Sequence, residues 1–483
     1  MPNGWHGKLE KITPYKWRIP KGYKEGMRVD GIVYTSEGLL KEASSEQALE
    51  QVANVAFLPG IQGASYAMPD IHWGYGFPIG GVAAMDAETG VVSPGGVGYD
   101  VSCGVRLLRT NMLVSEVKDY LEPLVHELGR NIPKGVGSRG KIRTNHKDME
   151  ELLATGVKWA IKNGYGWRED LDFIEEGGSM AGADPAKVSQ RAYERGFQQP
   201  GTLGAGNHFV EVQEVVEIYD ERVAEVFGLY KGQLVVMIHS GSRGLGHQVC
   251  TDYIKVMEKV GCGIELPDRQ LACAPINSDA GRSYLAGMAA AVNYALTNRH
   301  CLAHLTRQSF ETIFKKSAES IGMQILYDVS HNTAKFEEHE VNGKKMRLCV
   351  HRKGATRAFP PGHPDVPEAY REVGQPVIIP GDMGRASYVL VGMEQGEREA
   401  FASTCHGAGR VMSRAKAKKV EPGWEVKRDL EQKGITVVAG SINLLSEEAP
   451  YAYKDVSQVV EICHQAGLSK KVAKVRPLGV VKG

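Results

Sequence analysis

The sequence lacks long apolar stretches. Within its 483 residues, no run reaches the ~18 consecutive apolar residues that a membrane-spanning helix needs, so we expect no membrane partner. The first residues, Met1 to His6, also lack the apolar core of a secretory signal peptide. These two absences predict a protein that stays inside the cell, in the cytoplasm.

Regular cysteine spacing and a strong net charge are also absent. The 8 cysteines form no CxxC pair and no disulfide framework, so we expect most of them to be reduced and packed as small core residues. Lys and Arg number 58 against 57 Asp and Glu, which leaves a net charge of +1. Because global charge does not favour nucleic acid, any RNA would have to bind a local basic patch.

Linkers of low complexity and fixed-period repeats are missing too, which favours one large domain over residues 1–483. Helical patterns occur after a capping box at Ser44–Gln47, over 115–128 with Gly129 as a stop, over 281–318 as one helix or two, and over 455–467. Short apolar runs typical of buried strands end in polar or glycine-rich turns at 234–241, 325–332, 348–354 and 377–384. Because helices and strands do not alternate regularly, we predict a mixed α+β fold whose strands deliver reactive side chains to one rim.

Glycine is abundant, at 57 residues, and it gathers in segments that also carry polar side chains. Residues 68–81 form a constrained loop with Asp70 and His72, although a structural turn explains this segment equally well. Residues 93–106 hold Asp100 and Cys103, whose spacing allows a carboxylate and a thiolate to reach one metal or to bridge two. Taken alone, this second segment is better explained by a buried cysteine beside a turn aspartate.

Three histidines follow glycine-rich or apolar runs, namely His208, His239 and His331. Together with Asp100 and Cys103 they make a mixed nitrogen, oxygen and sulfur ligand set, which suits Mn²⁺, Zn²⁺ or Co²⁺ without choosing among them. In the same glycine loop as His208, Glu211 is a candidate base-reading acid. No helix follows that loop, so it is not a dinucleotide fingerprint. Arg243, in a Ser/Gly loop, is a candidate phosphate ligand.

A further histidine, His406, lies in the segment STCHGAGR. A helical pattern over 411–416 predicts that His406 stands near a helix start, where the helix N-terminus and Arg410 would stabilise negative charge on a phosphate. A histidine nucleophile must be neutral, and a carboxylate partner would orient its ring. The alternative is a capping loop with an incidental histidine.

Eight segments in order, from about residue 55 to Gly483, together resemble the RtcB family of RNA-splicing ligases. They are MPDIHWGYGFPIGG, GGVGYDVSCGVR, GTLGAGNHFVEV, IHSGSRGLGH, DVSHN, VHRKGATRAFPPG, PGDMGRASYVL and CHGAGR. The resemblance implies a single α+β domain with metals in a deep cleft. It also implies an enzyme that joins RNA 2′,3′-cyclic phosphate or 3′-phosphate ends to 5′-hydroxyl ends in tRNA splicing or RNA repair. The cofactors would be GTP and two Mn²⁺ ions. The partners would be tRNA halves or broken RNA ends and an archease-type activator.

The same resemblance implies residue roles. Cys103 would bridge the two Mn²⁺ ions, one held also by His239 and His331 and the other by Asp100 and His208. His406 would take guanylate from GTP, with Asp70 orienting its ring, and pass it to the RNA 3′-phosphate. Arg243 and Arg410 would hold RNA phosphates. The guanylate would contact Asn207, His208, Phe209, Val210, Glu211, His331, Asn332, Pro380, Gly381, Asp382, Met383, Ser387, His406, Gly407, Ala408, Gly409 and Lys482.

One segment departs from the family pattern. Many members have Ser-Met-Gly-Thr where this chain has Asp382-Met383-Gly384-Arg385. The carboxylate of Asp382 would repel a bound phosphate, and Arg385 is expected to neutralise it. This change puts the nucleotide contacts, and the choice between a splicing ligase and a specialised repair enzyme, in question.

Two other functions remain compatible with the residues. The metal ligands alone would suffice for a metal-dependent phosphodiesterase that opens RNA cyclic phosphates without joining ends. A non-catalytic RNA- or nucleotide-binding protein is the other alternative, although it would have no need for five metal-ligand candidates.

Overall fold

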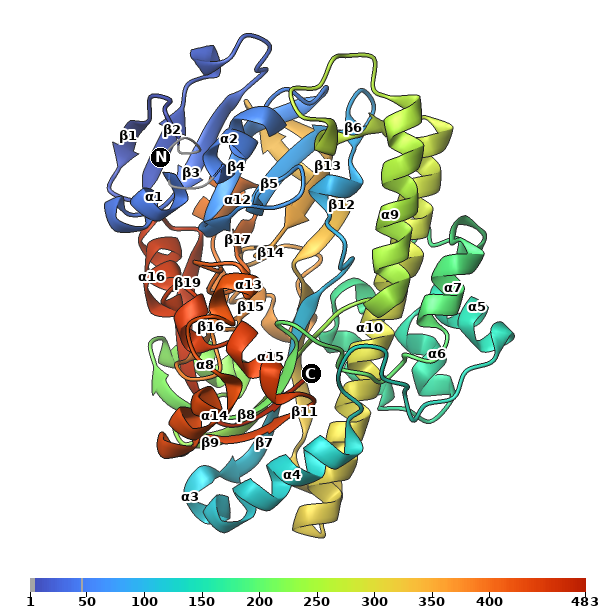
Figure 1. Cartoon of the computed structure of the whole chain (residues 1–483), viewed down its shortest axis with the longest axis vertical. Coiled ribbons are helices and arrows are strands. Elements are labelled where there is room, and N and C mark those ends of the chain that lie inside the picture. Colours follow the sequence, from blue (N-terminus) through green and yellow to red (C-terminus); the bar gives the residue numbers. More distant parts are fainter. Residues whose placement is uncertain (1–4, 45–46) are drawn as a thin grey trace.

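A computed structural model describes residues 5–44 and 47–483. Its first large sheet lies in the N-terminal part of the molecule, at the top of Figure 1. Its strand order is β1 (Glu10–Thr13), β2 (Lys16–Ile19), β3 (Asp30–Tyr34), β4 (Ile61–His72), β5 (Ile79–Asp86), β13 (Lys344–Lys353) and β12 (Asn332–Val341). All neighbours pair antiparallel except β3 and β4, which are parallel.

The second large sheet carries most of the predicted metal ligands at its strand ends. Its order is β11 (Gln324–Ser330), β7 (Gly104–Leu113), β9 (Gln233–Ser240), β8 (Phe209–Ile218), β19 (Ser469–Lys482), β16 (Ser387–Gly392) and β15 (Pro376–Ile379), with β18 (Thr436–Ala439) parallel to β19. Two small ribbons complete the strands: β6 (Val91–Val92) with β10 (Ala274–Pro275), and β14 (Ala355–Arg357) with β17 (Ser403–Cys405).

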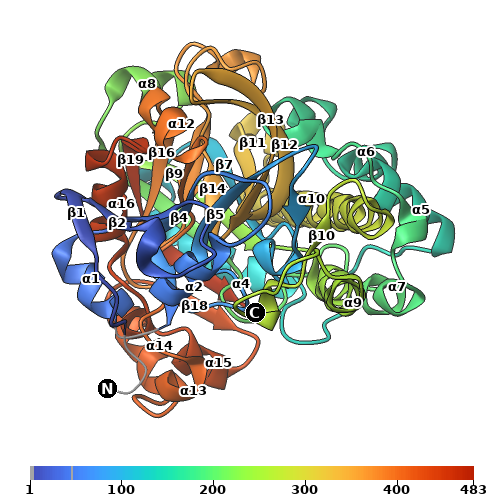
Figure 2. The ribbon, with the colours of Figure 1, turned by 90° about the horizontal axis from the view of Figure 1, so that it is seen from above.

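A long buried helix, α10 (Asp279–Phe314), packs against the second sheet. The sequence allowed one helix or two over this region, and the structure has one unbroken helix of 36 residues, followed by the short α11 (Ala318–Ile321). Ser278 caps it by accepting a hydrogen bond from the Gly281 amide. Near it lie α4 (Leu121–Asn131), α5 (His146–Thr155), α6 (Val157–Lys162), α7 (Gln190–Gly196) and α9 (Arg243–Val260). Of these, α5, α6, α7 and α9 form one side of the molecule together with α10 in both views (Figures 1 and 2).

The remaining helices are short and cover the other sides of the two sheets. They are α1 (Glu37–Ser44), α2 (Ala48–Val55), α3 (Val114–Val117), α8 (Glu221–Phe227), α12 (Glu394–Ala400), α13 (Arg414–Ala417), α14 (Gly423–Gln432), α15 (Ile442–Glu447) and α16 (Val456–Gln465). Of the capping box predicted at Ser44–Gln47, Ser45 and Glu46 lie outside the described residues. No helix in the described ranges is long and apolar enough to cross a membrane.

The mixed α+β class is confirmed, whereas two predicted helix limits are wrong. The pattern over 115–128 is divided between α3 and α4, and α4 continues through Gly129 to Asn131. Gly129 is there for close packing, because a Cβ on it would lie 2.5 Å from Val438. Over 411–416 only α13 forms, and it begins at Arg414. The limits of a single domain, 1–483, stay a prediction.

Candidate metal centre and adjoining histidine

Four neighbouring strands bring the predicted metal ligands to one rim of the second sheet. Cys103 precedes β7 and His208 precedes β8, while His239 lies near the end of β9 and His331 follows β11. Because these neighbours run antiparallel, the start of one strand lies beside the end of the next. Ligands that are far apart in the sequence therefore converge.

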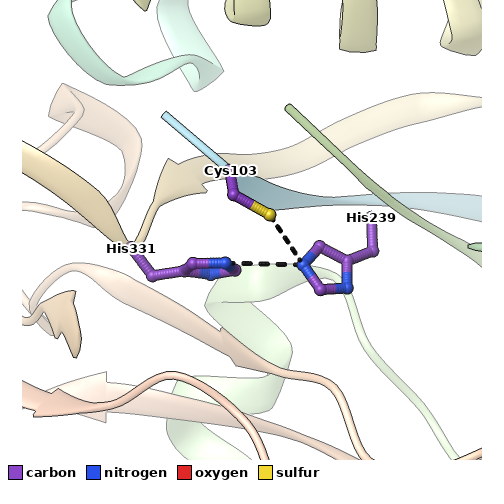
Figure 3. Close-up of side chains that lie close together, drawn as sticks. All are labelled: Cys103, His239 and His331. Carbon is purple, nitrogen blue, oxygen red and sulfur yellow. Dashed lines mark hydrogen bonds between the residues drawn. The ribbon is translucent and has the colours of Figure 1, made fainter. Parts of the chain in front are cut away.

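The first group of possible ligands comprises Cys103, His239 and His331 (Figure 3). The Cys103 Sγ lies 3.2 Å from His239 Nε2, and the Nε2 atoms of His239 and His331 are 3.4 Å apart. Burial holds the pKa of both histidines well below the usual value, so their rings are neutral and can act as ligands.

The second group comprises Asp100, Cys103 and His208. His208 Nε2 lies 2.9 Å from Asp100 Oδ2 and 3.4 Å from Cys103 Sγ. Its other ring nitrogen, Nδ1, lies 3.0 Å from the Leu203 carbonyl oxygen, which places the Nδ1 proton there and leaves Nε2 for a ligand. Burial would raise the pKa of Asp100, but His208 and Arg243 outweigh it and bring that pKa to about 2.

Cys103 belongs to both groups, and within each group the ligand atoms lie within 4.8 Å of one another. A thiolate can bridge two metal ions, and imidazole, carboxylate and thiolate together suit a transition metal. Burial, followed by the charge of Asp100, raises the pKa of the Cys103 thiol, so a metal would have to displace its proton. The donor set fits a two-metal centre.

A buried ion-pair network holds this rim together. Arg299 of α10 binds Asp328, with Nη2 2.7 Å from Oδ1, and its Nη1 donates to the carbonyl oxygens of Ser102 and Ser240. Arg106 of β7 also contacts Asp328, at 2.7 Å. These contacts tie together β7, β9 and β11, the three strands that place Cys103, His239 and His331.

A cavity of about 390 Å³ adjoins the ligand groups. Its wall includes His406, whose ring centroid is 5.0 Å from that of His331. His406 follows β17 and lies in a loop, so the predicted position at a helix start is wrong. The reason is the glycine turn after it: Gly409 has φ +74°, and a Cβ there would lie 2.5 Å from the Asp70 carbonyl oxygen. The loop therefore packs on β4 and does not coil.

Asp70 of β4 is fully buried and holds His406 in place. Its Oδ2 lies 2.6 Å from His406 Nδ1 and accepts from the amides of His406 and Gly407, at 2.8 and 3.2 Å. Burial opposes ionisation, but the interactions with His406 prevail and the pKa of Asp70 is lowered. A carboxylate at Nδ1 places the ring proton there and leaves the Nε2 lone pair free to react.

The predicted phosphate-binding arginines have different surroundings. Arg410 lies 3.1 Å from the buried carboxylate of Glu448, which also binds Arg414 at 2.7 Å. Arg243 contacts Thr202 and His208, and no ion-pair partner lies within 4.0 Å of it among the described residues. Arg410 is therefore held by an ion pair within the protein, whereas Arg243 is not. Binding of RNA phosphates by Arg243 and Arg410 stays a prediction.

Most residues predicted to contact guanylate line the cavity. They are Asn207, Phe209, His331, Asn332, Pro380, Gly381, Asp382, Met383, His406, Gly407, Ala408, Gly409 and Lys482. Four others do not form its wall. Ser387 lies behind the wall and accepts a hydrogen bond from the Gly381 amide at 3.0 Å. Glu211 is buried next to Gln213, His208 faces the metal groups, and Val210 lies on the opposite face of β8, in the core. Their contacts with guanylate stay predictions.

The charged substitution at Asp382 is buried in the cavity wall. Its Oδ1 accepts from the Gly384 amide at 2.9 Å, while Oδ2 lies 3.3 Å from Arg385 Nη1 without hydrogen-bond geometry. The expected pairing with Arg385 is present, but it is partial. Burial therefore raises the pKa of Asp382 to about 6.

Replacing Asp382 by asparagine is expected to raise the free energy of unfolding by about 1–3 kcal/mol near pH 7. The folded state binds this proton more tightly than the unfolded state, so the wild type loses stability as pH rises from about 4 to about 6. Denaturant unfolding of both proteins near pH 7 and near pH 4 tests this. If the wild type and Asp382→Asn have equal free energies of unfolding at both pH values, ionisation of Asp382 does not destabilise the folded protein.

Sequence patterns did not reveal several other residues of the wall, among them Lys353, Glu448 and Tyr99. Lys353 donates to the carbonyl oxygens of Tyr75 and Phe77, and burial lowers its pKa to about 7. The only available signal was its position in the segment VHRKGATRAFPPG, because a buried lysine looks like any other in a sequence.

Comparison with known proteins gives matches along almost the whole chain. A family model described as "tRNA-splicing ligase RtcB" matches residues 51–483. Proteins of that name from Archaeoglobus fulgidus and Thermococcus kodakarensis are 57% and 54% identical over 479 and 477 residues. These alignments cover 99% and 98% of this chain and 99% of each relative.

Proposed function

Since this chain belongs to the RtcB family, we propose that it joins RNA ends through a guanylate carried on His406. The substrates would be a 2′,3′-cyclic phosphate or 3′-phosphate end and a 5′-hydroxyl end, with GTP as the nucleotide. The relatives are named for tRNA splicing, so tRNA halves are the first RNA to test, and broken RNA ends are the second. An archease-type activator and a cytoplasmic location remain part of this proposal.

One observation carries the proposal: a histidine oriented by a buried carboxylate stands beside the candidate metal groups. His406 Nδ1 is 2.6 Å from Asp70, and its ring contacts that of His331. An incidental histidine in a loop would not need a fully buried aspartate, because burying a carboxylate is costly. Here Asp70 makes three hydrogen bonds, with the His406 ring and with the amides of His406 and Gly407.

The residues of the chain suit the following phosphoryl transfers. His406 Nε2 attacks the α-phosphorus of GTP, the bond to the β-phosphate oxygen breaks and pyrophosphate leaves. Asp70 keeps the proton on Nδ1 and balances the positive ring. Water first opens a 2′,3′-cyclic end to a 3′-phosphate, and this 3′-phosphate takes the guanylate from His406, which leaves as the neutral ring. The 5′-hydroxyl oxygen then attacks the activated 3′-phosphate, GMP leaves, and the hydroxyl proton passes to solvent. Two Mn²⁺ ions held by Asp100, Cys103, His208, His239 and His331 would supply neutralising charge for the phosphates.

Glu211 and Lys482 offer a means of recognising guanine. Phe209 and Lys482 line the cavity, with the Lys482 Nζ 5.6 Å from the Phe209 ring centroid, and Glu211 projects from the same face of β8 as Phe209. Burial raises the pKa of Glu211 to about 8 and lowers the pKa of Lys482 to about 8, the latter against the opposing charges of Glu448 and Glu211. In its ionised form, Glu211 would accept hydrogen bonds from the N1 and amino groups of guanine.

Replacing Glu211 by glutamine is expected to slow guanylation by roughly tenfold or more and to reduce the preference for GTP over ATP, because glutamine presents a donor to the donors of guanine. Guanylation rates with GTP and ATP measure this. Glu214→Gln is the matched control, because it makes the same change on the same strand at a partly exposed residue that pairs with Arg476 outside the cavity. If Glu211→Gln keeps the wild-type preference for GTP over ATP, Glu211 does not recognise the base.

The proposed function is tested with one RNA that ends in a 2′,3′-cyclic phosphate and another that begins with a 5′-hydroxyl. In the presence of Mn²⁺ we expect a joined product only when GTP is added. Hydrolysis of the cyclic end without GTP, and with no joined product, would instead identify a phosphodiesterase. RNA binding without turnover under any metal would identify a non-catalytic protein.

A further inference from the structure

The corner of the molecule built by α13, α14 and α15 exposes large apolar side chains. Trp424 on α14 is 56% exposed, and Val420 before it and Ile442 at the start of α15 are exposed as well. A Cβ on Gly423 would lie 1.8 Å from the Ile442 carbonyl oxygen, so the start of α14 packs tightly on the start of α15. The three helices lie together in Figure 2. Large apolar side chains that gather in one exposed place indicate an interaction surface.

The same corner is positively charged, although the whole chain is nearly neutral. Residues 414–433 contain seven Lys and Arg against four Asp and Glu. Lys416 and Lys419 are exposed, and neither has an ion-pair partner within 4.0 Å among the residues that the structure describes. An exposed aromatic ring within a basic surface is the combination that binds single-stranded nucleic acid, because bases stack on the ring while cations hold the phosphates.

The ring of Trp424 is held in place by its own helix. The buried side of α14 consists of Gly423, Val426 and Leu430, whereas Trp424 and Arg428 are exposed. Arg428 lies one turn after Trp424 and places its Cζ 5.5 Å from the centroid of the ring. A ring that is already restrained loses less conformational entropy when a base stacks on it.

This corner is joined to the wall of the cavity by α13 and α15. Arg414, the first residue of α13, lines the cavity and binds Glu448, which follows α15 and lies in the same wall. Lys418 binds Glu447 at the end of α15, at 2.5 Å. From Ile442 to Glu447, α15 rises by about 8 Å. The exposed apolar surface therefore begins about one short helix away from the cavity.

We propose that the surface formed by Trp424, Lys416 and Lys419 binds the single-stranded flank of the RNA that carries the 3′-phosphate. The proposal rests on the proposed function, because it takes RNA as the substrate. A nucleobase stacks on Trp424, and the two lysines contact backbone phosphates. The order of the chain assigns the strand: His406, which must reach the 3′-phosphate, is followed by Arg414 in the cavity wall and then by these lysines.

Binding of a single-stranded RNA that ends in a 3′-phosphate, measured by fluorescence anisotropy without GTP, tests this surface. Trp424→Ala is expected to weaken binding about tenfold, which corresponds to the loss of one stacked base. Lys416→Ala combined with Lys419→Ala should reduce the slope of log affinity against log salt by about 1.4, because each phosphate contact with a single strand contributes about 0.7. Circular dichroism checks that both variants fold.

Matched controls exist elsewhere on the chain. Phe336 on β12 is also exposed and has Arg347 over its ring, at 4.8 Å, but it lies outside the cavity wall. Lys255 and Lys259 are exposed on α9. Phe336→Ala, and Lys255→Ala combined with Lys259→Ala, should bind the RNA as the wild type does.

Photocrosslinking identifies the strand, with 5-iodouridine placed near the 3′-phosphate of one RNA or near the 5′-hydroxyl of another. We expect only the first RNA to crosslink to the peptide that contains Trp424. The proposal is overturned if Trp424→Ala and the lysine variant bind the first RNA as the wild type does, or if only the second RNA crosslinks to this peptide. Neither readout needs guanylation or ligation. A ligase that binds RNA elsewhere would fail these tests, and an RNA-binding protein without ligase activity would pass them.

Discussion

Replacing Cys103 by alanine is expected to abolish RNA ligation and to weaken metal binding at both ligand groups. Cys103 Sγ is shared by the two groups, and it lies 3.2 Å from His239 and 3.4 Å from His208. Loss of one supporting residue outside the ligand set already costs about 10- to 100-fold in metal affinity, so loss of a bridging ligand should cost at least ~100-fold. We expect ligation to fall below detection.

Titration of Mn²⁺ into the purified protein, with the metal content measured after dialysis, tests this prediction. Cys301→Ala is the matched control, since Cys301 is equally buried but lies in α10 and in neither ligand group. The control should bind metal as the wild type does. Normal metal content and ligation in Cys103→Ala would show that the thiol is only a core residue.

Replacing Asp70 by asparagine is expected to slow guanylation of His406 by about 10²- to 10⁴-fold, since the same change behind the histidine of a serine-protease triad costs about 10⁴-fold. Asp70 Oδ1 has no hydrogen-bond partner among the described residues, so the new amide group can occupy that position while the oxygen keeps its contacts with His406. The variant should therefore fold normally and lose the negative charge that balances the ring.

Single-turnover guanylation rates measure this effect, with Mn²⁺ content and circular dichroism as checks on folding. Asp70→Ala should be slower still, because it removes the orienting contacts as well as the charge. If Asp70→Asn reacts within about threefold of the wild type, orientation and charge from Asp70 do not contribute to the reaction.

Local patterns predicted individual ligands but not their convergence. His239 and His331 were recognisable because each ends an apolar strand, and those strands are β9 and β11. Their proximity depends on the pairing of β7 with both, which joins segments more than a hundred residues apart. Strand pairing of this kind leaves no periodic trace in a single sequence. Residue types alone suggested that Asp100, Cys103 and the histidines form one ligand set, but their division into two metal sites sharing Cys103 rested on the resemblance to a family.

Where predictions from local sequence patterns failed, tertiary packing determined the structure instead. The pattern over 411–416 is helical, yet the chain just before it is held in an extended course. Gly409 packs on the Asp70 backbone, and Arg410 forms an isolated antiparallel β-bridge with Tyr453. Glu448 escaped notice for another reason. It is fully buried between Arg410 and Arg414, and a sequence does not distinguish a buried carboxylate from a solvated one.

The central claim, a guanylate carried on His406, is tested most directly by incubating the protein with α-labelled GTP and Mn²⁺ and then denaturing it. We expect label that stays with the wild-type protein, that is released by acid as phosphoramidates are, and that maps to the peptide containing His406. His406→Ala should carry none. Absence of protein-bound label, or label that persists in His406→Ala, would contradict the claim.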